Sequence, residues 1–122
     1  MIRWVFLLRR RPGMSTEDFR DYYERHHARL GEKHVPQAAR YVRRFLDPPP
    51  LSTAPVDDAD DVITELWFLA REDLDAAVEH LSSPAVQAEI VADELRLFDR
   101  SRTRSYLVVE HDSPVQRASL AP

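Results

Sequence analysis

Four short apolar segments alternate with helical stretches along this 122-residue chain, and their order is the feature that most constrains its fold. The strand-like segments, rich in β-branched and aromatic side chains, are residues 2–9, 39–46, 62–69 and 104–111. Apolar stripes with helical spacing predict helices over about residues 16–33, 71–82 and 84–98. The order strand–helix–strand–strand–helix–strand predicts an α+β, ferredoxin-like fold, in which a four-stranded antiparallel sheet carries its helices on one face.

The remaining segments divide the chain into one domain and a tail. The length fits a single domain. We expect it to span residues 1–112, with residues 113–122 as a flexible C-terminal tail because they lack a hydrophobic period. Residues 47–61 contain three consecutive prolines and several aspartates, which favour an extended, solvated connection. Because this connection is long, we expect it either to be mobile or to cover a pocket.

Composition excludes several classes of protein. The chain has no cysteine, which removes disulfides, thiolate metal sites and cysteine nucleophiles. Its net charge of −4 provides no general attraction to nucleic acid, and the basic run at residues 9–11 is interpreted as a solvated strand end. The two glycines are too few for a glycine-rich phosphate loop. We therefore expect neither a nucleic acid nor a nucleotide as partner.

The N-terminal segment lacks the pattern of an export signal. Its apolar run, residues 2–8, is short and precedes the basic residues, which reverses the order found in secretory signals. No segment of the sequence reaches the length needed to span a bilayer. We therefore expect a cytoplasmic protein without membrane contact.

Both faces of the predicted sheet look apolar. Residues 2–8 and 62–69 carry few polar side chains at either set of alternating positions. The helices cover one face, so the other would expose an apolar patch of the kind that marks an association surface. A second copy packing the same face against it is the simplest solution, and we expect a homodimer.

His27 is the main candidate for chemistry. It lies one turn after Tyr23 on the inner side of the first predicted helix. An imidazole suits general acid or base work near neutral pH, whereas the structural alternative is a half-buried histidine bonded to a carbonyl. His27 and His34 are separated by about 10 Å along a helix axis, too far to share one metal ion. We expect no dedicated metal site.

Two acidic residues are candidates to assist His27. Glu65 interrupts an apolar strand and shares a face with Trp67 by alternation. It is either paired and structural, or it lies beside a pocket with a raised pKa. Asp93 lies in the second half of the last helical segment, where it either pairs with a nearby arginine or orients the imidazole. Trp67 is either plain core or a flat wall for an aromatic ligand.

Several stretches together resemble the EthD-domain family. They are residues 5–15, residues 19–30 with an aromatic pair before a histidine, residues 65–68 and residues 93–99. The resemblance covers about residues 2–110. It implies a dimeric α+β barrel, in which two four-stranded sheets pack together and each subunit has a pocket between sheet and helices.

The resemblance also implies a type of chemistry. Members are similar to small enzymes of natural-product and aromatic catabolic pathways, including methylmuconolactone isomerases and polyketide decarboxylases or dehydratases, and others are associated with oxidative ether degradation. In isomerase-like members a first-helix histidine does acid–base chemistry, and His27 matches it. Such members can also use a cysteine, which this chain lacks, so that mechanism does not transfer whole.

These observations favour a cofactor-independent enzyme that isomerises, cyclises, dehydrates or decarboxylates a hydrophobic aromatic or polyketide-like substrate. The expected catalytic residues are His27, Glu65 and Asp93, and the expected substrate-binding residues are Tyr23, His34, Tyr41, Trp67 and Phe98, together with Val5 or Leu7. Tyr41 is expected to donate to a developing oxyanion. The alternatives are a non-catalytic protein that binds a pathway intermediate, and an accessory partner of an oxidoreductase system.

Overall fold

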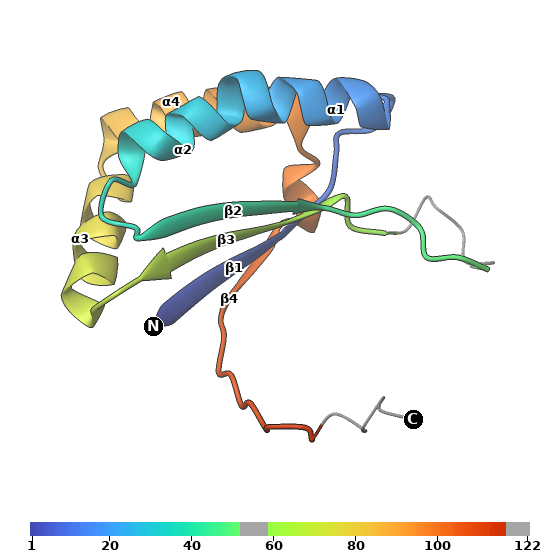
Figure 1. The fold of residues 1–122 in the computed structure, drawn as a ribbon. Coiled ribbons are helices and arrows are strands. Elements are labelled where there is room, and N and C mark those ends of the chain that lie inside the picture. Colours follow the sequence, from blue (N-terminus) through green and yellow to red (C-terminus); the bar gives the residue numbers. More distant parts are fainter. Residues whose placement is uncertain (52–58, 117–122) are drawn as a thin grey trace, which may run out of the picture.

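The computed structural model describes residues 1–51 and 59–116. Its sheet has the strand order β2-β3-β1-β4, and every neighbouring pair is antiparallel. The strands are β1 (Ile2–Leu8), β2 (Arg40–Phe45), β3 (Val62–Phe68) and β4 (Arg104–Leu107). The sheet with its helical layer confirms the predicted α+β, ferredoxin-like fold (Figure 1).

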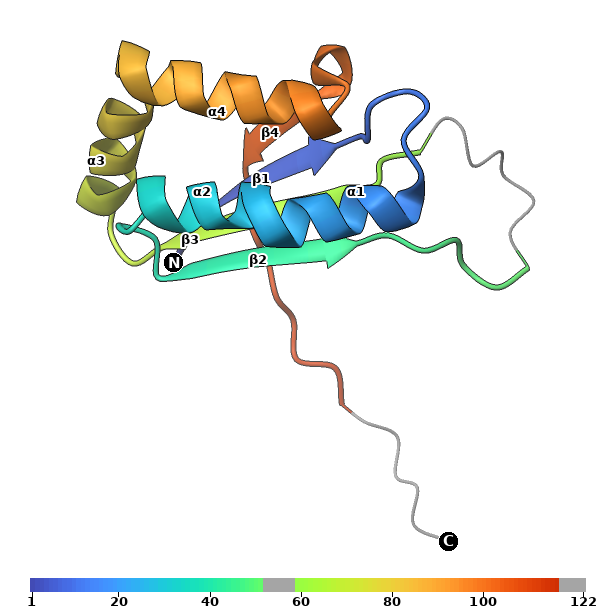
Figure 2. The ribbon, with the colours of Figure 1, turned by 90° about the horizontal axis from the view of Figure 1, so that it is seen from above.

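The helices form one layer on one face of the sheet (Figure 2). They are α1 (Thr16–Tyr22), the π-helical turn η1 (Tyr23–His27), α2 (Ala28–His34), α3 (Arg71–Leu81), α4 (Pro84–Leu97) and the short 3-10 helix η3 (Arg100–Arg102). The first three are continuous and make one long rod beside β2, whereas α4 runs on the other side of the layer and α3 closes one end (Figure 2). The predicted first helix is therefore confirmed, with a π turn inside it that the sequence pattern does not indicate.

Local sequence signals explain where two of these helices begin. The Ser15 hydroxyl accepts a hydrogen bond from the Asp18 backbone N–H at 3.0 Å, which caps α1. Ser83 caps α4 in the same way, and Pro84 occupies the first turn, where its missing N–H has no cost. Both starts follow from the Ser residues that precede the apolar periods.

The core lies between the helical layer and one set of strand positions. The side chains of Val62, Leu66 and Phe68 on β3 are buried beneath the helices, and Phe19 of α1 and Leu97 of α4 meet them with no exposed surface. Apolar burial of this kind provides the main driving force for folding. Because these positions alternate, the intervening residues of β3 lie on the opposite face of the sheet.

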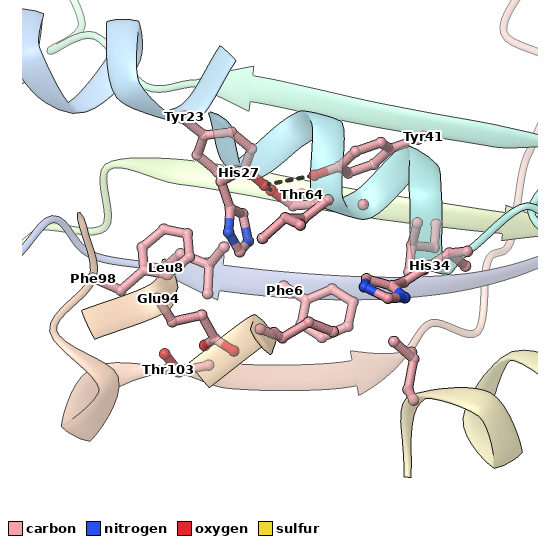
Figure 3. Close-up of a pocket in the computed structure, with 16 residues that line it drawn as sticks. Phe6, Leu8, Tyr23, His27, His34, Tyr41, Thr64, Glu94, Phe98 and Thr103 are labelled. Carbon is pink, nitrogen blue, oxygen red and sulfur yellow. Dashed lines mark hydrogen bonds between the residues drawn. The ribbon is translucent and has the colours of Figure 1, made fainter. Parts of the chain in front are cut away.

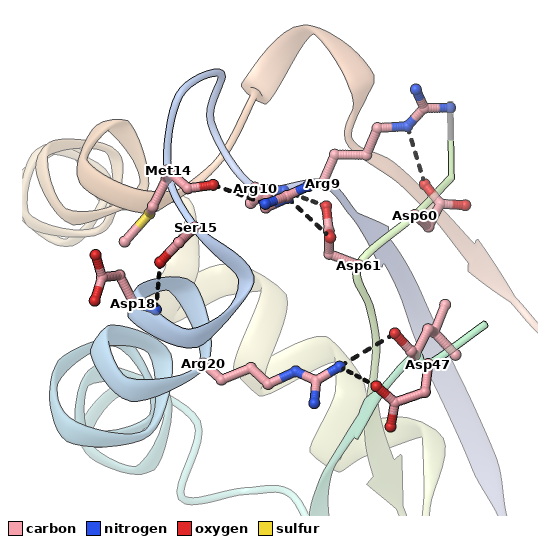
Figure 4. Close-up of polar contacts among 10 residues, drawn as sticks. Arg9, Arg10, Met14, Ser15, Asp18, Arg20, Asp47, Asp60 and Asp61 are labelled. Carbon is pink, nitrogen blue, oxygen red and sulfur yellow. Dashed lines mark hydrogen bonds and ion pairs between the residues drawn. The ribbon is translucent and has the colours of Figure 1, made fainter. Parts of the chain in front are cut away.

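Ion pairs fasten the end of β1 to the segment that leads into β3 (Figure 4). Asp61 accepts hydrogen bonds from the Arg10 backbone N–H at 2.8 Å and pairs with its guanidinium at 3.3 Å. Arg9 pairs with Asp60 at 3.5 Å. Arg9 and Arg10 are thus partly buried in ion pairs, which corrects the interpretation of this basic run as merely solvated.

The open face of the sheet is more polar than the sequence pattern indicated. Strand register places Val42, Glu65, Val5 and Tyr106 in one row across it. In the next row the guanidinium groups of Arg3 and Arg40 lie 3.8 and 4.3 Å from the Trp67 ring centroid, a cation–π arrangement. The expectation of two largely apolar faces is therefore wrong for this face, which combines apolar positions with charged ones.

The C-terminal part differs from the sequence prediction in length. β4 ends at Leu107, whereas a strand was expected to reach residue 111. Residues 52–58 of the expected pocket-covering connection and residues 117–122 of the expected tail lie outside the described part of the chain. Within that described part, no helix has the length and apolar character needed to cross a membrane.

Candidate active site

A cavity of about 270 Å³ lies between the helical layer and the sheet. Phe6, Leu8 and Leu66 line it from the sheet, and Leu30 and Ile90 line it from the helices, so most of its wall is apolar. Polar side chains reach it from several elements, as Figure 3 shows. An apolar pocket with a few convergent polar groups is the usual form of a small-molecule site.

The π turn η1 carries two of the aromatic side chains of this cavity. The Ala28 N–H donates to the carbonyl of Tyr23, five residues earlier, so the turn contains one residue more than a regular α-helical turn. Tyr23 begins the turn and His27 ends it, and both line the cavity. Their rings meet edge to face with centroids 5.2 Å apart. Such π turns occur frequently at functional sites.

His27 is held by Asp93 of α4. The His27 Nδ1 lies 2.9 Å from Asp93 Oδ2, and the two side chains are 14% and 13% exposed. Asp93 also accepts a hydrogen bond of 2.5 Å from the Tyr22 hydroxyl. Because a carboxylate accepts, a neutral His27 donates its Nδ1–H and keeps its lone pair on Nε2. His27 lines the cavity and Asp93 does not.

Glu94 follows Asp93 on α4 and lines the same cavity as His27. Burial raises the pKa of its carboxyl above the usual glutamate value, and the nearby His27 and Arg100 offset only part of this increase. Arg100 Nε is 3.7 Å from Glu94 Oε2. The site therefore combines a histidine that can accept a proton with a carboxyl that retains its proton to a higher pH than an exposed glutamate.

Three hydroxyl groups form a chain in the cavity wall under α2. The Tyr23 hydroxyl lies 2.6 Å from that of Thr64 and 3.4 Å from that of Tyr41 (Figure 3). All three residues line the cavity. Burial raises the pKa of both tyrosines, most strongly that of Tyr23, so both phenols remain protonated near neutral pH. They are hydrogen-bond donors for any oxygen that forms nearby.

His34 lines the other end of the cavity wall. Its Nδ1 lies 3.1 Å from His80 Nε2, and its Nε2 lies 3.0 Å from Glu89 Oε2. Both ring nitrogens of this buried side chain thus have partners, and they join α2 to α3 and α4. These two contacts hold the His34 ring in place in the cavity wall. Among the described residues, no group of three or more His, Cys, Asp or Glu side chains is placed to hold a metal ion.

The structure brings together most of the side chains that sequence analysis singled out. His27 and Asp93 are in contact, and the cavity is lined by Tyr23, His27, His34, Tyr41 and Phe98. Glu65 and Trp67 are elsewhere, because they occupy the alternate positions of β3 and face the open side of the sheet. There Glu65 accepts hydrogen bonds from Arg44 at 2.8 Å and from the Trp67 indole at 2.9 Å.

This placement corrects three expectations. Trp67 does not line the cavity, so it provides no wall for a ligand there. Glu65 is not beside His27; burial acts to raise its pKa, but its bonds to Arg44 and Trp67 more than compensate, and the pKa is lowered. The strand β1 contributes Phe6 and Leu8 to the cavity in place of the expected Val5 or Leu7. The expected strands β1 and β3 do line the cavity, but through the residues on the face opposite to the expected one.

Three polar residues of the cavity, Thr64, Glu94 and Thr103, are not among the sequence candidates. Glu94 belongs to the family-like stretch of residues 93–99 without being a candidate itself, and Thr64 is a polar residue within an apolar strand. An acidic residue within the apolar period of the last helix, next to Ile90 and Leu97, was the available signal for Glu94. No sequence signal marks Thr103, which lies between η3 and β4 and reaches the cavity through the turn that joins them.

The sequence profile of the EthD domain matches residues 11–101, most of the chain. This chain belongs to the EthD domain family. Sequence analysis predicted that membership from the aromatic pair before His27 and from the stretch that contains Asp93 and Glu94. No curated protein matches this EthD domain significantly.

Solved structures show the same fold. An EthD family protein from Bacillus halodurans superposes with a TM-score of 0.63 at 16% identity, over 91% of this chain and 100% of that one. HapK from Hahella chejuensis gives 0.57 at 11% identity, over 95% and 100%. SnoaB, a cofactor-independent oxygenase from Streptomyces nogalater, gives 0.53 at 11% identity, over 92% and 94%. At these identities the likeness shows a shared fold and leaves the reaction open.

Proposed function

We propose that this EthD domain is a cofactor-independent enzyme that moves a proton on a hydrophobic, ring-bearing substrate, with isomerisation, cyclisation, dehydration or decarboxylation as the outcome. The observation that carries the proposal is the pairing of His27 with Asp93 at the wall of an apolar cavity that also contains Glu94. A histidine oriented by a carboxylate is a recurrent arrangement for general-base catalysis.

The proposed reaction begins at His27. Its Nε2 lone pair removes a proton from a carbon adjacent to a carbonyl group of the substrate, and the imidazolium that forms is stabilised by Asp93. The electron pair moves onto the carbonyl oxygen. Hydroxyl donors such as Tyr41 stabilise that oxyanion, because a hydrogen bond in a cavity with little water is stronger than one in solution.

The proposed second step returns a proton. Glu94 is suited to give it, because its raised pKa keeps a larger protonated fraction near neutral pH than an exposed glutamate has. A proton delivered to a different atom from the one that lost it yields an isomer. When the substrate carries a hydroxyl group on the carbon next to the deprotonated one, the enolate expels this hydroxyl, and the proton from Glu94 makes it water. When the substrate carries a carboxyl group on the carbon next to the carbonyl, His27 takes the carboxyl proton, the C–C bond breaks to release carbon dioxide and form the enolate, and Glu94 protonates the carbon. No oxidant or reductant is consumed in any of these cases.

We also propose that the protein acts as a homodimer through the open face of the sheet. Val5, Val42 and Ile63 form the apolar part of this face, and Arg40 and Arg44 lie along its β2 edge. A two-fold partner would cover the apolar rows and leave the charged edge in contact with water. The cavity lies on the other face, so each subunit of such a dimer keeps a complete site.

Exchange of carbon-bound hydrogen for deuterium tests the proposed chemistry without knowledge of the natural substrate. We expect the protein in D₂O to accelerate exchange at the acidic methylene group of a bicyclic ketone such as 2-tetralone, observed by proton NMR. His27→Gln should lower the rate by about 10² to 10⁴. His26→Ala is the matched control, because the His26 ring is exposed and does not line the cavity.

The same experiment separates the enzyme from a ligand-binding protein. A protein that only carries an intermediate would bind ring compounds equally well with and without His27 and would show no exchange above the buffer rate. Exchange that is unchanged in His27→Gln would end the assignment of His27 as the base.

A further inference from the structure

The size of the cavity limits the ligand. An apolar cavity of about 150 Å³ holds one benzene ring. The cavity of this protein, at about 270 Å³, therefore suits one or two fused rings and is too small for a ligand of four. This restricts the ring-bearing substrate of the proposed function to the small end of its class.

The charges around the cavity limit the ligand further. Among the described residues that line it there is no lysine or arginine. Its two histidines already have acidic partners, Asp93 for His27 and Glu89 for His34. A carboxylate or phosphate ligand would lose its water and meet the Glu94 carboxyl instead of a cation, which costs several kcal/mol in a low-dielectric site. The ligand is therefore not an anion, and of the proposed outcomes isomerisation, cyclisation and dehydration fit this site better than decarboxylation, which starts from a carboxylate.

Hydrogen-bond donors remain available at the β2–β3 side of the cavity. The hydroxyls of Tyr23, Tyr41 and Thr64 carry three protons, and two contacts join them, at 2.6 and 3.4 Å. At least one O–H therefore has no acceptor within the chain of hydroxyls. A ligand oxygen placed beside this chain would accept it.

A second polar position lies at the β4 side. The Glu94 carboxyl provides it, since Glu94 lines the cavity at this side, next to Thr103 (Figure 3). A carboxyl group can accept a hydrogen bond from a ligand hydroxyl or, when protonated, donate one to a ligand oxygen. β1 separates β3 from β4 in the sheet, and its residues Phe6 and Leu8 line the cavity between the two polar positions.

We propose that the ligand is an uncharged one- or two-ring compound with an oxygen function at each end, one bonded by the Tyr41–Tyr23–Thr64 hydroxyls and the other by the Glu94 carboxyl. This inference deepens the proposed function and rests on it. The apolar middle of the ligand lies on Phe6 and Leu8, and His27 of the π turn lies beside the rings.

Calorimetric titration with a matched series of ligands tests the inference. We expect naphthalene-2,6-diol to bind most tightly, with 2-naphthol about threefold to tenfold weaker and naphthalene weaker again by a similar factor, since each step removes one hydrogen bond. The anion 2-naphthoate should bind at least about tenfold more weakly than 2-naphthol. Anthracene-2,6-diol, whose third ring would extend beyond the cavity, should bind more weakly than naphthalene-2,6-diol. Equal affinities for the diol and the hydrocarbon, or tight binding of the anion, would overturn the inference.

Variants locate each end of the ligand. Tyr41→Phe should weaken binding of the diol by about threefold to tenfold while leaving naphthalene affinity unchanged, because it keeps the apolar volume. Glu94→Leu should weaken binding of the diol by a similar factor without weakening binding of naphthalene. Tyr106→Phe, on the exposed strand β4, is the control. His27→Gln should keep the binding order and lose deuterium exchange. If the wild-type protein shows the expected binding order but no exchange, the result counts against the enzyme alone. If it shows exchange without that order, the result counts against this ligand class alone.

Discussion

The Tyr41 phenol occupies the space where a side chain on Gly31 would begin. A Cβ atom at position 31 would lie 2.5 Å from Tyr41 Cε2 and 2.8 Å from its hydroxyl oxygen. Gly31 lies within α2, where glycine ordinarily costs stability. Its presence therefore allows the ring to approach the helix and to place its hydroxyl beside that of Tyr23.

We expect Gly31→Ala to destabilise the protein by about 1–3 kcal/mol, the usual cost of overpacking, although alanine is favoured over glycine in helices. In a Tyr41→Ala background the same change should be neutral or should stabilise by about 0.5–1 kcal/mol. Urea denaturation of the four proteins gives the coupling energy. If the effects of the Gly31 and Tyr41 substitutions on the free energy of unfolding are strictly additive, the two side chains do not compete for the same space.

Asp93→Asn tests whether Asp93 positions His27. An asparagine amide can donate to Nδ1, which would leave the proton on Nε2 and remove the base from the cavity. We expect deuterium exchange to fall by about 10² to 10⁴ with little change in ligand affinity. Tyr22→Phe removes one hydrogen bond to Asp93 and should cost at most about tenfold. A purely structural role would instead weaken binding and exchange together.

Glu94 should make stability depend on pH. Because burial raises its folded-state pKa, the folded protein binds more protons than the unfolded chain between the usual glutamate pKa and the raised one, so this contribution falls as pH rises through that interval. Glu94→Gln cannot ionise. Its stability relative to the wild type should therefore increase in denaturation experiments as the pH rises from the usual glutamate pKa through the raised one.

The control for this comparison is Glu79→Gln on the exposed surface of α3, which changes the net charge equally. A stability difference for Glu94→Gln that does not vary with pH, or that follows the Glu79 variant, would show that the Glu94 carboxyl is not held in an apolar environment.

Val5→Asp tests the proposed homodimer. Val5 lies in the middle of the open face, beside Glu65 of β3, and an added carboxylate there would be buried without a partner in the interface. Such a charge costs about 3–5 kcal/mol, which corresponds to at least about a hundredfold weaker association. Sedimentation measures the change. Val78→Asp, on the exposed part of α3, should remain as the wild type; a wild-type protein that is monomeric at micromolar concentration would refute the dimer.

The order of elements could be predicted because each segment carries its own period. The helical stripe around Phe19 and Tyr23 and the alternation in residues 62–69 are local signals, and the fold follows from their sequence. The side of the sheet could not be predicted in the same way. Glu65 and Trp67 were correctly placed on one face, but both faces of that strand had similar hydropathy, so nothing local indicated which face the helices would cover.

The candidate site was predictable to a similar degree. His27 and Asp93 were both identified, and one contact between α4 and the π turn joins them. Glu94 and Thr103 depend on the shape of a gap between three elements, which no single segment encodes. The neighbours Asp93 and Glu94 differ by about 100° around the helix axis, and only the position of α4 determines which one reaches the cavity.

The additional residue in η1 determines how the side chains of α2 are rotated about the helix axis relative to those of α1. Without it, α2 would turn by about 100° relative to α1, and Gly31 and His34 would leave the cavity. Phe19, before the π turn, would keep its place in the core. An insertion or deletion of one residue at this point would thus bring different side chains of α2 into the cavity wall and leave the sheet unchanged. Proteins with the same sheet can therefore present different side chains to their ligands.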